Sequence, residues 1–273
     1  MILHGELPDI FVAFQEITEN WMRLQLSRVT MTAFAFGVLA VSTIGQASAA
    51  PAESPVVAAA THVDAALEAT PFGADQVWLF KDDQYVRYNV ANDTVVVGPR
   101  TIAEGWPGLP VQFTRGIDAA VPSPLGANQA WLFKDDQYVR YDLANDTVVV
   151  GPRSIAEGWP ALPARFASGI DAAVTATPFS TDQVWLFKDD EYVRYDARTD
   201  TIVVAPRKIS LGWTQMPQQF DYKIDAAVTS SYGPNQAWLF NDADYLRYDT
   251  KTDKTVTDPR GTAEGWPGLR WTS

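Results

Sequence analysis

Residues 76–88 read QVWLFKDDQYVRY, and nearly the same thirteen letters return at 129–141, 183–195 and 236–248. The tryptophan of each copy follows the aspartate of an Asp-Ala-Ala step by 13 or 14 residues and precedes a second tryptophan by 28. A period of 53 or 54 residues is typical of repeat architectures. Four equivalent units therefore run from Val63 to the C-terminus.

Each unit contains four short runs rich in Val, Trp, Phe and Tyr, bounded by turn-forming residues. In the first unit the runs are 63–67, 77–81, 84–89 and 94–98. Asp82-Asp83 leaves room only for a tight hairpin, and Ala91-Asn92-Asp93 forms the next turn. The pattern predicts a four-stranded antiparallel meander, followed by a linker with one helical turn, because Pro107 and Pro110 would stop a longer helix.

The strands carry apolar residues at nearly every position, which predicts that both faces of each sheet are buried. Radially stacked sheets provide such burial. The predicted fold is all-β, a four-bladed β-propeller of four-stranded antiparallel blades. The predicted blades span about 62–115, 116–168, 169–222 and 223–273.

The composition is that of an acidic globular protein. Hydrophobic residues make up 47% of the 273 positions, and 21 Lys and Arg against 33 Asp and Glu give a net charge of −12. No stretch concentrates positive charge, which argues against a nucleic-acid partner. The absence of cysteine excludes disulfides, thiol catalysis and thiolate metal sites, and leaves the redox compartment open.

The N-terminal segment has the features of an export signal. Residues 29–52 carry no charge, Arg23 and Arg28 precede them, and Ala47-Ser48-Ala49 offers a cleavage site. We predict a signal peptide over residues 1–49, whose true start is Met22 if the acidic first 21 residues are not translated. A short linker would follow at 50–61, and the mature chain would be secreted. The alternative is a retained membrane anchor, although the apolar part falls short of about 20 residues.

The ordered set of motifs resembles the hemopexin-like repeat family. The set is Asp-Ala-Ala, Trp-Leu-Phe-Lys, Tyr-Val-Arg-Tyr-Asp and Gly-Trp-Pro-Gly-Leu-Pro. The resemblance implies a small disc whose central channel holds calcium, sodium or chloride ions. It further implies that backbone groups of the inner strands hold these ions, first at Asp64, Asp118, Asp171 and Asp225, and next at Ala66, Ala120, Ala173 and Ala227.

The residues themselves agree with this expectation. Only small side chains let four strands converge on an axis, and carbonyl oxygens are hard ligands suited to calcium. The alternative is that the channel holds only water and that each aspartate caps a turn. Vertebrate family members typically tie the first and last blades with a disulfide, so closure of this cysteine-free chain must rest on packing.

A candidate ligand site follows from the variable loop between the first two strands. Its tip carries an apolar residue in every unit, and all four loops leave the inner strands in the same direction. An apolar ring at one channel mouth could hold a planar or aliphatic ligand, unless each side chain packs on its own blade. The four tip residues are Phe72, Leu125, Phe179 and Tyr232.

One histidine remains after cleavage, His62, two residues before Asp64. It could ligate a haem or a metal at a channel mouth, or be an ordinary surface residue. Bis-histidine ligation within one chain is excluded. The recurring arginines are expected to be structural and to pair between blades with carboxylates. They are Arg87, Arg140, Arg194 and Arg247, and Arg100, Arg153, Arg207 and Arg260, with Glu104, Glu157 and Glu264 as partners.

No catalytic motif is present, which predicts that the protein is not an enzyme. Two functions stand. The first is a secreted binding protein with channel ions and a small ligand at the mouth, either a polyamine or haem, of which the acidic charge favours the polyamine. The second is a protein interaction or adhesion module that uses the acidic outer surface, with purely structural ions. One fold serves both uses, so the fold alone does not choose.

Overall fold

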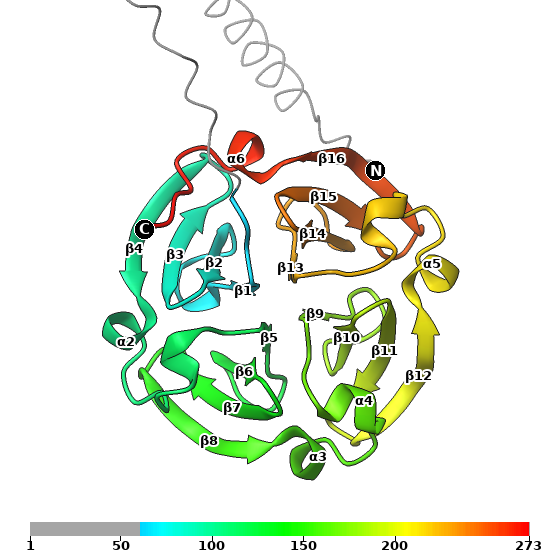
Figure 1. Ribbon diagram of the computed structural model, residues 1–273, viewed down its shortest axis with the longest axis horizontal. Coiled ribbons are helices and arrows are strands. Elements are labelled where there is room, and N and C mark those ends of the chain that lie inside the picture. The colour runs from blue at the N-terminus through cyan, green and yellow to red at the C-terminus, as the bar shows by residue number, and fades with distance from the viewer. Residues whose placement is uncertain (1–60, 273) are drawn as a thin grey trace, which may run out of the picture. The chain divides into compact units, whose positions relative to one another are not determined.

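The computed structural model describes residues 61–272, which belong to one compact unit. Sixteen strands form four separate antiparallel sheets, and the sheets stand around a common axis (Figure 1). The four-bladed propeller predicted from the repeats is therefore confirmed. The predicted signal peptide and most of the predicted linker lie outside the described residues. Within residues 61–272, no helix is long and apolar enough to span a membrane.

Each blade is a meander of four strands in chain order, counted from the axis outward. The first blade contains β1 (Ala65–Glu68), β2 (Gln76–Lys81), β3 (Gln84–Asn89) and β4 (Thr94–Thr101). The second contains β5 (Ala119–Pro122), β6 (Gln129–Lys134), β7 (Gln137–Asp142) and β8 (Thr147–Ser154). The third contains β9 (Ala172–Thr175), β10 (Gln183–Lys188), β11 (Glu191–Asp196) and β12 (Thr201–Lys208). The fourth contains β13 (Ala226–Thr229), β14 (Gln236–Asn241), β15 (Asp244–Asp249) and β16 (Lys254–Gly261).

Short helical turns follow the outer strands and interrupt the loops. One turn per blade lies at the rim, as the prolines of the linker predict: α2 (Ile102–Gly105), α3 (Ile155–Gly158), α5 (Ile209–Gly212) and α6 (Thr262–Gly265) (Figure 1). The remaining turns are η1 (Thr70–Phe72), η2 (Phe113–Arg115), α4 (Ala164–Ala167) and η3 (Gln218–Phe220).

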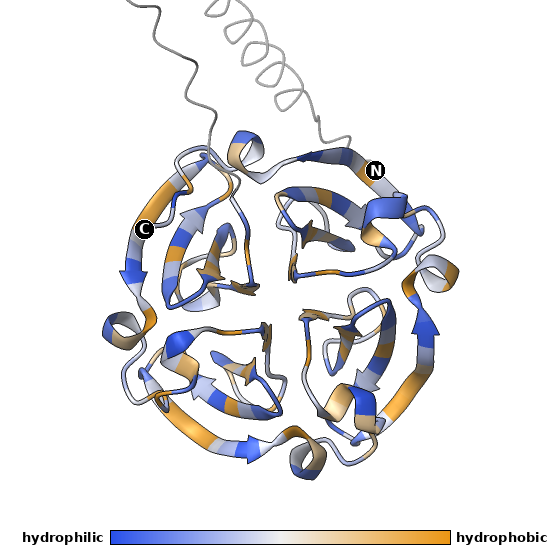
Figure 2. Cartoon of the chain, viewed as in Figure 1, coloured by the Kyte–Doolittle hydropathy of each residue, from blue (hydrophilic) through white to orange (hydrophobic). Residues whose placement is uncertain are grey.

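The core lies between blades, because successive side chains of a strand point to opposite faces of its sheet. Ala65 belongs to the buried cluster shared with the second blade, whereas Ala66 belongs to the cluster shared with the fourth. Figure 2 shows apolar and polar bands along the strands. Each blade is therefore stabilised mainly by its neighbours.

An aromatic contact recurs at every junction. The second tryptophan of one blade packs against a buried tyrosine of the next, with ring centroids 5.0–5.3 Å apart, a geometry favourable for aromatic pairs. The pair that joins the fourth blade to the first has the same geometry as the others, so the ring closes by packing. The pairs are Trp106 with Tyr141, Trp159 with Tyr195, Trp213 with Tyr248, and Trp266 with Tyr88.

The C-terminal tail adds polar contacts at this closing junction. Trp271 Nε1 donates a hydrogen bond to the His62 carbonyl at 3.0 Å. The Thr272 amide donates a hydrogen bond of 2.9 Å to Gln84 Oε1, and Gln84 Nε2 donates one of 2.7 Å to the Thr272 carbonyl. The first and last blades are thus joined without the disulfide that the family resemblance leads one to expect.

Candidate functional site

A hollow of about 200 Å³ lies at one end of the propeller axis. All four aspartates of the Asp-Ala-Ala steps line it, together with one histidine and one lysine. The structure therefore brings together four of the predicted metal-site residues and His62. The lining residues are His62, Asp64, Asp118, Asp171, Lys223 and Asp225.

The aspartate carboxylates in this mouth already have partners. One oxygen of each accepts a hydrogen bond of 2.6–2.7 Å from the first amide of the β-hairpin in its own blade. That hairpin residue has a φ of about 50°, the left-handed conformation of a tight turn, and its amide points at the carboxylate. The hairpin residues are Asp82, Asp135, Asp189 and Asp242. Each inner aspartate therefore caps a turn, whatever else its backbone does.

The second carboxylate oxygen pairs with a lysine in every blade. In the first three blades the lysine ends the second strand, at Lys81, Lys134 and Lys188, with N–O distances of 3.4, 2.7 and 2.8 Å. The fourth blade has Asn241 there, and Lys223 replaces the missing charge at 2.6 Å from Asp225. The sequence shows that Asn replaces Lys in the fourth repeat, but it does not show that Lys223 takes over the ion pair with Asp225.

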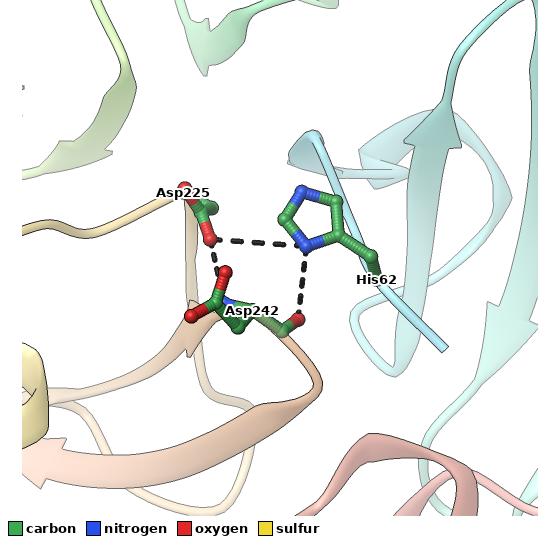
Figure 3. A group of neighbouring side chains, drawn as sticks. All are labelled: His62, Asp225 and Asp242. Atoms are coloured by element: carbon green, nitrogen blue, oxygen red, sulfur yellow. Dashed lines mark hydrogen bonds and ion pairs between the residues drawn. The ribbon is translucent and has the colours of Figure 1, made fainter. Parts of the chain in front are cut away.

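His62 bridges the first and fourth blades at this mouth (Figure 3). Nε2 lies 3.1 Å from a carboxylate oxygen of Asp64, and Nδ1 lies 3.0 Å from the Asp242 carbonyl and 3.8 Å from Asp225. The hydrogen bond to Asp64, opposed by burial and assisted by the charge of Asp225, raises the pKa of His62. Both ring nitrogens of His62 already have partners, Asp64 at Nε2 and the Asp242 carbonyl at Nδ1, so this arrangement disfavours haem.

Within residues 61–272, one group of side chains has the spacing of metal ligands. It consists of His62, Asp225 and Asp242, each of which has one ligand atom within 4.8 Å of the others. A metal at this group would compete with the proton of His62. Burial raises the pKa of Asp64, but hydrogen bonds from His62 and the Asp82 amide outweigh it and hold that pKa below its ordinary value. The mouth is thus a network of compensated charges.

The alanines of the inner strands present backbone groups along the axis. Hydrogen-bonded pairs of an antiparallel ladder alternate. The Ala69 amide donates a hydrogen bond to the Gln76 carbonyl, so Ala69 is in a hydrogen-bonded pair with β2. Every second residue shares this pairing, which includes Leu67 and Ala65 and leaves Ala66 in a non-hydrogen-bonded pair. Its amide and carbonyl therefore face away from β2, toward the open edge of the innermost strand. The same register places Ala120, Ala173 and Ala227 equivalently.

The four tip residues do not join this mouth. They follow the inner strands, whereas the aspartates precede them. Phe72, Leu125 and Tyr232 each line a groove between two blades instead. Phe72 packs edge-on against Trp78 at 5.5 Å, and the Arg87 guanidinium stacks 3.9 Å from its ring centre. Phe179 and Tyr232 make the same contacts with Trp185 and Trp238, and Leu125 lies in a groove with Trp131. Packing on the same blade, the alternative left open above, therefore describes the rings of Phe72 and Phe179. Tyr232 also contacts the first blade, because its hydroxyl donates a hydrogen bond to the Val90 carbonyl at 2.6 Å.

The expected pairing of arginines with glutamates between blades is wrong. Arg260 bonds to Glu264 at 2.7 Å, but both belong to the fourth blade and both are exposed. Among residues 61–272, neither Arg100 nor Arg153 forms an ion pair with its expected glutamate. The side chains instead line grooves between neighbouring blades. Sequence reasoning missed these grooves because strict recurrence suggested structure alone.

Comparison with known proteins agrees with this architecture. The Hemopexin family profile matches residues 63–111 and 117–164. Albumin-2 of Pisum sativum is 30% identical over an alignment of 213 positions, and the match covers 72% of this chain and 90% of that protein. The crystal structure of the hemopexin fold protein CP4 from cow pea has a TM-score of 0.68 at 30% identity, covering 76% of this chain and 96% of that one.

Two solved structures from Cicer arietinum are also similar. One is a plant albumin showing hemagglutination, with a TM-score of 0.70 and 28% identity over 77% of this chain and 97% of that chain. The other is a plant lectin with two metal binding sites, with a TM-score of 0.68 and 28% identity over 76% and 96%. With the four-bladed architecture and the recurring motifs, these matches show that the chain belongs to the hemopexin-like repeat family.

Proposed function

We propose that this chain is a secreted, non-enzymatic binding protein whose four inner strands hold a calcium ion on the propeller axis. The observation that carries the proposal is the convergence of four equivalent strand edges, each with a backbone carbonyl that no strand partner uses. Carbonyl oxygens at a site with room for several ligands suit calcium. Sodium and chloride are further candidates for the same channel.

The side chains around the mouth support the ion indirectly. Four aspartates surround the axis, and their carboxylates are held by lysines and hairpin amides. They therefore fix the ends of the inner strands and leave the ligand positions to backbone oxygens. A similar lectin with two metal binding sites adds support for metal binding in this family.

A polyamine suits the mouth better than haem does. Its amines would meet the aspartates, whereas the propionates of haem would face them. The four apolar tip residues do not line this mouth, so the methylenes of a polyamine would not contact them there. His62 has partners on both ring nitrogens, which leaves neither free for iron. Spermine is therefore the small ligand we propose, with modest affinity.

The calcium proposal is tested by thermal unfolding of the secreted chain in a chelator and in excess calcium. A ligand that binds only the folded state stabilises it in proportion to the logarithm of its concentration. We expect the melting temperature to rise with calcium and to fall in chelator, with magnesium at the same ionic strength as the control. Superimposable melting curves would contradict the proposal.

Export has its own test. N-terminal sequencing of secreted material is expected to begin at Ala50. An intact N-terminal segment in a membrane fraction would contradict export by cleavage. This experiment does not depend on calcium, so the two parts of the proposal can fail separately.

A second function, adhesion through several binding sites on one molecule, is favoured by the grooves between blades. Three such grooves have equivalent linings. The similar albumin that shows hemagglutination is consistent with multivalent binding.

A further inference from the structure

A groove of about 180 Å³ lies between the first and second blades. Its walls are aromatic, and it opens to solvent beside Phe72, whose side chain is 47% exposed. Two arginines of the first blade and one aspartate of the second line it. The residues that the argument uses are Phe72, Arg87, Arg100, Trp106 and Asp146.

Hydrogen-bond donors in this groove have no acceptor within residues 61–272. Arg87 Nε and Trp106 Nε1 are both buried and unpaired. Trp106 is only 3% exposed, so water does not reach its indole freely. The exposed Arg100 at the groove edge forms no ion pair with a described carboxylate. Three donor groups from one blade thus point to a ligand that accepts hydrogen bonds.

Leaving these groups unpaired is costly for the folded chain. A buried donor without an acceptor loses its hydration, and Arg87 Nε and Trp106 Nε1 are both such donors. Phe72 compensates in part by stacking on Arg87 at 3.9 Å. Burial lowers the pKa of Arg87, as expected for a cation that lacks a carboxylate partner. An anion in the groove would remove this cost.

The opposite wall has a different character. Asp146 comes from the turn of the second blade and is exposed at the groove, where a carboxylate accepts hydrogen bonds from hydroxyl groups. A ligand that carries an anionic group at one end and hydroxyls at the other matches both walls. Acidic peptides carry the anion but not the hydroxyls.

We propose that the groove between the first and second blades binds an acidic saccharide, with its carboxylate on Arg87, Arg100 and the Trp106 indole and its hydroxyls toward Asp146. The volume is below the roughly 300–1,000 Å³ of drug-sized ligand sites, and suits one sugar ring of a longer chain. Arginine pairs with a carboxylate through parallel hydrogen bonds, which fixes the orientation of the ring.

Equivalent unpaired arginine donors recur at the other three junctions, and at the junction between the third and fourth blades the donor is Arg194 Nε. The groove between the fourth and first blades contains the unpaired Arg247 Nε and Trp266 Nε1. The groove between the second and third blades contains the unpaired Arg140 Nε. Several weak sites on one disc would give a multivalent saccharide its avidity.

The junction between the third and fourth blades provides an internal control. There the equivalent of Arg100 is Arg207, which donates a hydrogen bond to the Leu211 carbonyl. The equivalent of Asp146 is Asp253, which accepts a hydrogen bond from the Thr214 hydroxyl at 2.6 Å. The sequence explains the difference, because Thr214 replaces the proline that follows the second tryptophan in the other blades.

The experiment is calorimetric titration of the full mature chain with glucuronate, in wild type, Arg100→Gln and Arg207→Gln. We expect saturable binding at several sites. Arg100→Gln should weaken only the site between the first and second blades, about tenfold, and so lower the number of sites filled at a given glucuronate concentration, since hydrogen bonds to charged groups are among the strong ones. Arg207→Gln should leave the affinity unchanged. Glucose, which lacks the anion, and glutarate, which lacks the hydroxyls, should bind more weakly than glucuronate. A trimer of galacturonate should bind more tightly than glucuronate if the natural ligand is a polysaccharide, and no more tightly if it is a free sugar acid.

Three results would overturn the proposal. The first is no saturable glucuronate binding at millimolar concentration. The second is equal weakening by Arg100→Gln and Arg207→Gln, which would place the site elsewhere. The third is tighter binding of an oligoglutamate peptide than of the galacturonate trimer, which would assign the groove to acidic peptides. Because chelator leaves the groove untouched, these results are independent of the axial calcium.

Discussion

The axial mouth and the groove between the first and second blades are both polar hollows, but the carboxylates of the mouth have partners and two buried donors of the groove do not. In the mouth, each aspartate has a lysine and a hairpin amide as partners within its own blade, as Asp118 has Lys134 and the Asp135 amide. In the groove, Arg87 and Trp106 keep buried donors without an acceptor. The difference indicates that the mouth's carboxylates are already engaged by the fold, which limits their affinity for a polyamine, whereas the groove's donors are fully available to a ligand.

The largest effect is expected from Asp225→Ala. Asp225 is 4% exposed. Its carboxylate accepts a hydrogen bond from the Asp242 amide at 2.6 Å and forms an ion pair with Lys223. Its removal leaves a partly buried donor and an unpaired lysine, so we expect the free energy of unfolding to fall by about 2–3 kcal/mol. Chemical denaturation measures this.

The matched control is Asp83→Ala, at the exposed hairpin tip of the first blade. Its carboxylate makes no hydrogen bond or ion pair with a described residue, so the change should stay within about 0.5 kcal/mol. Equal losses in the two variants would mean that the mouth's carboxylates are not structural.

A smaller effect, dependent on pH, is expected from His62→Ala. The pKa of His62 is raised in the folded chain by Asp64 and Asp225. Its contribution to stability is therefore fully present below the unfolded value of about 6.5 and is lost as pH rises through the folded value. We expect the free energy of unfolding of wild type to exceed that of the variant by more at about pH 5.5 than at about pH 8.5. A difference that is constant across this window would show that His62 does not act through its charge.

The smallest effect on stability is expected in the groove. Arg100 is exposed and unpaired, so Arg100→Gln should change the free energy of unfolding by less than about 0.5 kcal/mol. Together with the loss of glucuronate affinity proposed above, this outcome would separate binding from folding. A loss comparable to that of Asp225→Ala would assign Arg100 a structural role.

The fold followed from local signals that the repeats present four times. Period, strand composition and the Asp-Asp and Ala-Asn-Asp turns predicted four meanders, because each signal acts within a few residues of its position. The outer strand was predicted to end at Gly98 but continues to Thr101. A register shift around Arg87 absorbs the extra length, and such irregularities have no clear sequence signature.

The site was harder to predict, because it depends on direction in space. The spacing placed Phe72 on a loop tip, but η1 turns its ring onto Trp78, away from the axis. Recurrence of Arg87 and Arg100 suggested ion pairs, yet the glutamate expected to pair with Arg100 does not reach it. Which charges find partners is decided by side-chain geometry between blades, and a single sequence does not contain that information.

The axial ion is the central claim about function, and diffraction from crystals grown with calcium tests it most directly. Anomalous scattering locates the ion without assumptions about its ligands. We predict a peak on the propeller axis whose nearest atoms are backbone oxygens of the four Asp-Ala-Ala steps, at the aspartates or at the alanines of β1, β5, β9 and β13, at about 2.3–2.6 Å. A peak held by the side chains of His62, Asp225 and Asp242 instead, or an axis without a peak, would contradict it.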